Sequence, residues 1–162
     1  MLAVVGCGNA NRCDDGVGPA VIQALKRRRD LAERADVRLL DAGVDGMAAM
    51  FAARGCQSLI VVDACLSGSP PGAIFEAPGG EFERGYQPVM NLHDFRWEHA
   101  LYAGRRMYGD AFPTDVTVLL IEAATTDFGL ELTSAVSAAA ATVADRIEAL
   151  IGLRLGQNQP AP

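Results

Sequence analysis

The sequence predicts one α/β domain, a three-layer α/β/α arrangement with a twisted, mostly parallel five-stranded sheet between two layers of helices. Short apolar runs rich in valine and isoleucine alternate with segments of helical periodicity. These runs are continuously apolar, which is typical of strands buried on both faces. A chain of 162 residues, half of them hydrophobic, buries roughly 70% of its unfolded surface without needing disulfides. We assign residues 1–155 to this domain and 156–162 to a frayed C-terminal tail.

The first half of the chain shows the alternation most clearly. Apolar residues recur at helical spacing after Pro19, which suits the first turn of a helix. Ser58 opens the most strand-like segment, SLIVVD, which ends in a carboxylate. The expected elements are strands at residues 2–6, 37–41 and 58–63, a helix from Val17 to near Arg34, and a helix at residues 47–54.

The second half is less regular. Paired prolines precede a weak strand at residues 73–76, which we place at a sheet edge. Residues 78–91 are glycine-rich and unpatterned, as in loops that bind ligands or move. A helix is expected to begin near Asp94, a buried strand to occupy residues 116–121, and a C-terminal helix to follow a cap at Thr133 or Ser134.

The charge balance excludes some partners. The chain has 20 acidic and 14 basic residues, and its one basic run, residues 26–29, is typical of a solvated helix end. We therefore expect no nucleic acid partner. The apolar N-terminal stretch is too short for a signal peptide or a membrane span, so we expect a cytoplasmic protein with no membrane partner. Its four cysteines form no CxxC pair and should stay reduced.

The first loop partly matches a dinucleotide-binding fingerprint. Gly6 and Gly8 would supply the tight turn and the close backbone approach. Asn11 stands at the third glycine position, and Asp14 and Asp15 would repel a pyrophosphate at the helix N-terminus. A nucleotide-binding domain is therefore a disfavoured alternative.

Ligands of open α/β sheets bind beyond the carboxyl ends of the strands. If the first strand lies between the second and third, Asp14, Asp15 and Asp63 crowd one crevice. One of the paired aspartates would cap the following helix, and the other would face the crevice. His93 closes the long loop, whereas His99 falls inside a helix and is expected to be partly packed. Two carboxylates and one imidazole can make an open metal site.

Several motifs together resemble the hydrogenase maturation proteases. They are GCGNANRCDDGVGPAVI at residues 6–22, DAGVDG at 41–46, LIVVDA at 59–64, the segment around His93, and IEAATTDFGLELTSAV at 121–136. The resemblance implies a phosphorylase/hydrolase-like α/β fold and an aspartyl-type endopeptidase. Its substrate would be the precursor large subunit of a nickel-iron hydrogenase, from which it removes a C-terminal extension after nickel insertion. It also implies metal-contacting and catalytic roles for Asp15, Asp63 and His93.

The resemblance further implies that nickel arrives with the substrate and that no tightly bound cofactor is present. Carboxylate and imidazole ligands should bind a free ion weakly. We expect Asp15, Asp63 and His93 to engage this nickel, while a water activated by the metal or by a carboxylate attacks the peptide. Some members have glutamate in place of Asp15, and many have proline where this chain has Ala123. The loop at residues 124–129 could therefore influence which precursor is accepted.

Two other functions stay open at this point. One is a non-catalytic metallochaperone or checkpoint protein that binds the loaded precursor through the same three residues. The other is a cysteine-dependent hydrolase. Cys7, Cys13 and Cys65 lie near the expected site, where they could be buried packing, soft contacts for nickel, or a thiol nucleophile paired with His93.

Overall fold

The computed structural model describes residues 1–83 and 95–156. Its strands are β1 (Leu2–Cys7), β2 (Val37–Gly43), β3 (Ser58–Cys65), β4 (Ile74–Pro78) and β5 (Asp115–Glu122). Its helices are α1 (Val17–Lys26), α2 (Arg29–Ala32), α3 (Gly46–Ala53), α4 (Gly80–Glu83), α5 (Trp97–Tyr108) and α6 (Ser134–Gly156), with 3-10 turns η1 (Cys13–Gly16) and η3 (Gly109–Ala111).

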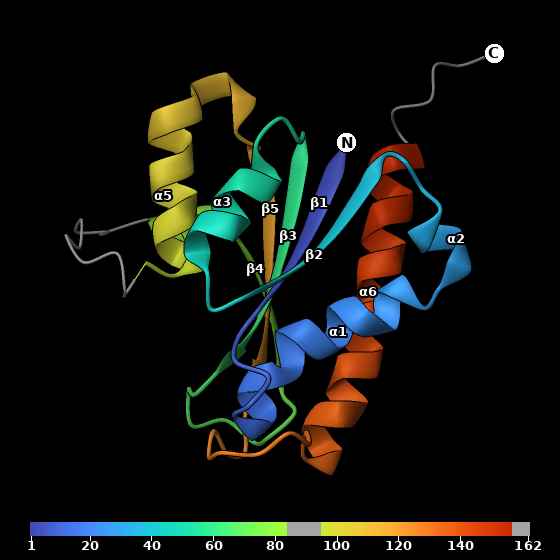
Figure 1. Cartoon of the computed structure of the whole chain (residues 1–162), viewed down its shortest axis with the longest axis vertical. Coiled ribbons are helices and arrows are strands. Elements are labelled where there is room, and N and C mark those ends of the chain that lie inside the picture. The colour runs from blue at the N-terminus through green and yellow to red at the C-terminus, as the bar shows by residue number, and fades with distance from the viewer. Residues whose placement is uncertain (84–94, 157–162) are drawn as a thin grey trace.

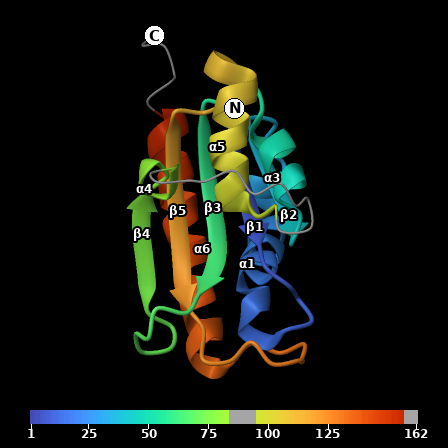
Figure 2. The same ribbon diagram turned by 90° about the vertical axis from the view of Figure 1, so that its left-hand side faces the viewer.

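The five strands form one sheet in the order β2-β1-β3-β5-β4. The first four strands in this order are parallel, and β4 runs antiparallel to β5 at the edge. This confirms the predicted mostly parallel sheet, the position of the first strand between the second and third, and the edge position of the weak strand. The carboxyl ends of β1, β3 and β5 consequently share one edge of the sheet, at the lower end of Figure 2.

Helices cover both faces of the sheet, with α1 and α6 on one face and α3 and α5 on the other (Figure 1). Alternate residues along each strand belong to one or the other of two hydrophobic cores, one on each face of the sheet. Val4 and Ile60 point into the core beneath α1 and α6, whereas Val5 and Val61 point into the core beneath α3 and α5. The three-layer α/β/α prediction is confirmed.

Two glycines let α1 pack unusually close to the sheet. A Cβ atom at Gly6 would lie 2.3 Å from the carbonyl oxygen of Gly18, and one at Gly18 would lie 2.1 Å from that of Cys7 and 2.6 Å from that of Val62. Only residues without side chains permit such backbone contact. The close packing brings η1, which precedes α1, to the end of β3.

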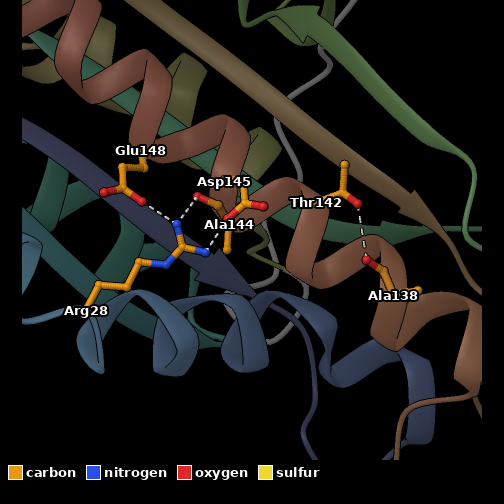
Figure 3. A network of polar contacts seen from close by, with 6 residues as sticks. All are labelled: Arg28, Ala138, Thr142, Ala144, Asp145 and Glu148. Carbon is orange, nitrogen blue, oxygen red and sulfur yellow. Dashed lines mark hydrogen bonds and ion pairs between the residues drawn. The ribbon is translucent and has the colours of Figure 1, made fainter.

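The predicted helix from Val17 to near Arg34 is wrong in its length. α1 ends at Lys26, and Arg28 has an extended backbone (φ −80°, ψ 102°) before the short helix α2 begins. The side chain of Arg28 reaches across to α6, where it pairs with Asp145 and Glu148 (Figure 3). The chain turns at Arg28 and this side chain links the turn to α6, so α1 and α2 are separate helices.

Three boundaries in the middle of the chain also differ from the predictions. β4 continues to Pro78, and Gly80–Glu83 forms the short helix α4 inside the expected loop; the rest of that loop lies outside the described residues. α5 begins at Trp97 and not near Asp94, because Arg96 is extended and its backbone N–H donates to Nδ1 of His99 (3.1 Å). His99 is half-buried, as predicted.

The C-terminal helix follows the predicted cap position. The carbonyl oxygen of Thr133 accepts from the backbone N–H of Ser137 (2.8 Å), which makes Thr133 the residue preceding α6. Gly156, predicted to open the frayed tail, is the last residue of α6, because Leu155 still packs against the core. Across residues 1–83 and 95–156, no helix is both long and apolar enough to cross a bilayer.

Candidate active site

A cavity of about 300 Å³ opens at the carboxyl edge of the sheet. It lies beside the end of β3 and the start of α5. Its walls include Asp15 from η1, Asp63 from β3, and Trp97 from α5. The other lining residues are Ala64, Cys65, Leu66, Phe82, Arg96, Glu98, Leu120 and Thr126. Two of the three predicted site residues, Asp15 and Asp63, therefore meet in one cavity.

Asp63 is buried near the end of β3 and is 5% exposed. Its Oδ2 accepts a hydrogen bond from the indole N–H of Trp97 (2.7 Å), and its Oδ1 accepts from the backbone N–H of Ala64 (2.8 Å). Burial raises the pKa of Asp63 to about 6, although these two hydrogen bonds and the nearby Arg96 oppose the shift. The carboxylate is thus held in one orientation while remaining costly to ionise.

Asp15 is half-buried at the end of η1. Its Oδ2 accepts from the backbone N–H of Asn9 (3.0 Å). Gly8 lies between the two aspartates: a Cβ there would come within 1.9 Å of the carbonyl oxygen of Asp15 and 3.3 Å of Oδ1 of Asp63. Gly8 also has a φ of 119°, which favours glycine. The glycines of the first loop therefore allow the aspartate-bearing turn to approach β3.

Asp14 takes a different role from its neighbour. We predicted that one of the pair caps the following helix, but α1 is preceded by Gly16 and receives no side-chain cap. Asp14 is fully buried and accepts hydrogen bonds from the backbone N–H groups of Ala124, Thr125 and Thr133 and from the hydroxyl of Thr133. Burial opposes ionisation, yet these donors lower its pKa. Asp14 thus joins η1 to the loop at residues 123–133.

Glu122 is a second structural carboxylate, buried at the end of β5. It accepts hydrogen bonds from the hydroxyl and backbone N–H of Ser67, the backbone N–H of Gly68 and the thiol of Cys65. The hydrogen bonds from Ser67, above all, lower the pKa of Glu122 to about 2. This carboxylate fixes the loop that follows β3, and so shapes one wall of the cavity.

The cysteines near the site behave mainly as packed or hydrogen-bonded thiols. Burial, together with the adjacent Glu122, raises the pKa of Cys65 to about 12. Burial also raises the pKa of Cys7, and nearby Asp63 adds to the shift. A nucleophilic cysteine needs an accessible thiolate, so neither environment favours the cysteine-dependent alternative. The Sγ of Cys13 packs against Gly129, and a Cβ atom added to that glycine would lie 2.5 Å from it.

The third predicted ligand, His93, lies outside the described residues. Within residues 1–83 and 95–156, no three side chains of histidine, cysteine, aspartate or glutamate gather as a metal-binding group. Of the predicted ligands, Asp15 and Asp63 line the cavity. The roles of Asp15, Asp63 and His93 as ligands and catalytic groups stay predictions.

Sequence reasoning missed the importance of Trp97. It identified this residue only as part of a helical pattern, whereas the structure places its N–H on Asp63 and its ring 5.1 Å from that of Phe82 in an edge-on contact. The available signal was that Trp97, the chain's one tryptophan, follows the predicted ligand His93 by four positions. A buried indole N–H needs a hydrogen-bond acceptor, and Asp63 is the acceptor it finds.

Comparison with known families and sequences gives consistent matches. A family model described as hydrogenase maturation protease matches residues 19–150. The chain is 37% identical over 106 residues to coenzyme F420 hydrogenase subunit delta of Methanothermobacter thermautotrophicus, covering 57% of this chain and 67% of that protein. It is 32% identical over 110 residues to the hydrogenase expression/formation protein HupD of Thiocapsa roseopersicina, covering 67% of this chain and 48% of that protein.

Solved structures with the same fold include two maturation peptidases. The hydrogenase maturating endopeptidase HybD from E. coli superposes with a TM-score of 0.77 and 23% identity, covering 93% of this chain and 91% of that one. The [NiFe] hydrogenase maturation protease HybD from Thermococcus kodakarensis gives a TM-score of 0.74 and 21% identity, covering 93% and 98%. At these identities the match establishes the shared fold.

Proposed function

Because the chain belongs to the hydrogenase maturation protease family, we propose that it removes a C-terminal extension from the nickel-loaded precursor of a nickel-iron hydrogenase large subunit. The members of this family are endopeptidases, so the chain is a hydrolase. The observation that carries the proposal is the meeting of Asp15 and Asp63 in one cavity at the carboxyl edge of the sheet. Ligand sites of open α/β folds lie at this edge.

In the proposal, the two carboxylates meet a cation carried by the substrate. Trp97 and Ala64 each donate one hydrogen bond to Asp63 and so fix its orientation. Partners of this kind commonly orient metal-binding carboxylates. Asp15 is the more exposed of the two carboxylates and lies beside Gly8. In the proposal, His93 joins them from the segment preceding α5 and completes the contacts to nickel.

Nickel is part of the substrate in this scheme. A site of two carboxylates and one imidazole, without thiolates, binds a free ion weakly and suits reversible engagement. Engagement would hold the scissile peptide next to the cavity. A water activated by the nickel or by a carboxylate then adds to the peptide carbonyl, the C–N bond breaks, and the released amine takes up a proton.

The test replaces Asp15, Asp63 and His93 one at a time with alanine. Each variant is incubated with nickel-loaded precursor, and the mass of the intact precursor is followed. We expect each replacement to abolish or strongly reduce trimming, whereas Asp110→Asn, an exposed aspartate on η3, should trim normally. Thermal unfolding checks that each variant folds.

Normal trimming by all three variants would rule out the proposed site. The same assay separates the peptidase from a non-catalytic nickel checkpoint protein, because such a protein would bind the loaded precursor without changing its mass. Precursor lacking nickel provides the remaining comparison: the proposal requires that it be trimmed much more slowly than loaded precursor.

A further inference from the structure

The most exposed large hydrophobic side chains are concentrated at the edge that carries the cavity. Among the described residues, Phe128 (86% exposed), Leu130 (79%), Val44 (72%) and Leu66 (70%) exceed all others of this kind. Val44 follows β2, Leu66 follows β3, and the other two follow β5. We call these four side chains the apolar rim.

Each member of the apolar rim lies at or beside a hollow in the surface. Leu66 lines the main cavity with Asp63. Val44 lines an adjoining small hollow that also contains Asp63. Leu130 lines a further groove with Pro19 at the start of α1, and Phe128 belongs to the same loop. The loops that follow β3 and β5, which carry Leu66, Phe128 and Leu130, lie at the lower end of the molecule in Figure 2. Leu66 and Val44 thus border hollows that contain Asp63, and Leu130 borders a separate groove beside α1.

The loop bearing Phe128 is held in place. The guanidinium of Arg12 lies 5.2 Å from the centre of the Phe128 ring, and its Nε donates to the carbonyl oxygen of Thr126 (2.9 Å). Arg12 also forms a β-bridge with Gly129. The backbone N–H of Thr125 also donates to the carboxylate of Asp14 (3.3 Å). These contacts hold the loop in which the exposed Phe128 ring lies. A rigid, exposed aromatic side chain is typical of a residue that anchors a protein partner.

Charge around the apolar rim indicates the kind of partner. The loops that carry the rim, residues 41–46, 65–72 and 123–133, contain four acidic residues, Asp41, Asp45, Asp127 and Glu131, and no lysine or arginine. Asp15, Asp63 and Glu98 line the cavity, and among the described residues the basic side chains beside them are Arg12 and Arg96, so acidic groups outnumber basic ones at this surface. An anionic lipid surface would be repelled by this pattern. A polypeptide with apolar side chains and neighbouring basic side chains would complement it.

We propose that the apolar rim is the docking surface for the precursor polypeptide, with Phe128 and Leu130 as its main anchors. This inference rests on the proposed function, and it assigns substrate recognition to residues that touch neither the nickel nor the scissile bond. The partner segment is apolar with basic neighbours, and its docking places the peptide to be cut over Asp15 and Asp63. Burying two large side chains that are now in water supplies affinity.

The test compares Phe128→Ala/Leu130→Ala with Met107→Ala/Leu153→Ala, which removes exposed apolar side chains from α5 and α6. Trimming of nickel-loaded precursor by otherwise unchanged enzyme gives KM and kcat. Binding of the same precursor is measured in an Asp63→Asn background, where trimming is expected to be abolished or strongly reduced, and each rim or control variant is compared with Asp63→Asn alone. We expect the rim variant to raise KM and Kd at least about tenfold, which corresponds to about 1.4 kcal/mol, with kcat unchanged. The control variant should match the parent protein.

The two measurements, trimming and binding, separate this inference from the function on which it rests. An enzyme that trims the precursor with the same KM after loss of Phe128 and Leu130 would overturn the docking surface but leave the peptidase intact. A protein that fails to trim, yet binds precursor in a rim-dependent way, would support docking and overturn the peptidase. Self-association, or binding to anionic vesicles, that is lost in the rim variant while precursor affinity is unchanged would assign the rim to those partners and overturn the proposal.

Discussion

Replacing Asp14 with alanine should severely destabilise the protein although Asp14 does not line the main cavity. Its side chain is fully buried and receives four hydrogen bonds from the loop at residues 123–133. The alanine variant would leave three backbone N–H groups of that loop without their acceptor. Buried unpaired donors are costly because they lose both water and protein partners.

The size of the effect follows from these contacts. Hydrogen bonds to a charged group contribute about 1.5–3 kcal/mol each, but the cost of burying the carboxylate opposes them. Leaving a buried donor without an acceptor costs about 1–3 kcal/mol. With three backbone N–H groups affected, and removal of the buried charge offsetting part of the loss, we expect the free energy of unfolding to fall by about 3–5 kcal/mol. For a chain of this length, this lowers Tm by about 6–20 °C.

Urea unfolding at pH 7 measures the change, and Asp127→Ala is the matched control. Asp127 is an exposed aspartate of the same loop that accepts one hydrogen bond from the hydroxyl of Thr125, so its loss should cost less than about 0.5 kcal/mol. Because the pKa of Asp14 is lowered, its contribution is present above the unfolded pKa and disappears as the pH falls through the folded pKa. A loss below about 1 kcal/mol for Asp14→Ala would refute this account of the loop.

Two further predictions concern the other buried carboxylates. Glu122→Gln should lower the pKa of the Cys65 thiol from about 12, because burial would remain but the negative charge beside the thiol would be lost. Faster alkylation of Cys65 by iodoacetamide, with Cys13 as internal reference, checks this, and unchanged reactivity contradicts it. For Asp63, the folded pKa of about 6 lies above the ordinary value, so wild-type stability should fall by up to about 3 kcal/mol as the pH rises from about 4 to 6 and then level off. Asp63→Asn should lack this slope, and parallel urea-unfolding profiles of the two proteins between pH 4 and 7 would show the reasoning to be wrong.

The sheet was predictable because its signal is local. Valine-rich runs such as SLIVVD have the composition of buried parallel strands, and the chain order left few ways to connect them. The end of α1 was harder to place, because apolar residues such as Leu31 continue a helical spacing beyond Lys26. At the break, Arg28 pairs with Asp145 of α6, more than 100 positions further along the chain. Contacts at that separation leave no local pattern.

The same reason explains what could be predicted of the site. Asp63 was identifiable because it ends a strand of known type, and Asp15 because it follows a glycine-rich turn. Sequence alone did not separate the roles of Asp14 and Asp15, since the groups that bind Asp14 come from residues 124–133. The indole of Trp97 reaches Asp63 across 34 positions. Partners of buried polar groups are set by tertiary packing, and spacing alone does not reveal them.

Three carboxylates at one sheet edge have received different environments. Asp14 and Glu122 are surrounded by donors that lower their pKa values, so both remain ionised and hold loops in place. Asp63 is buried, Trp97 and Ala64 are its hydrogen-bond donors among residues 1–83 and 95–156, and its pKa is raised. A buried carboxylate with few hydrogen-bond donors lowers the stability of the free protein when it is ionised. It gains the most favourable interaction energy when a cation binds beside it. In the proposed function that cation comes with the precursor, so the instability of Asp63 in the free enzyme would become affinity for loaded substrate.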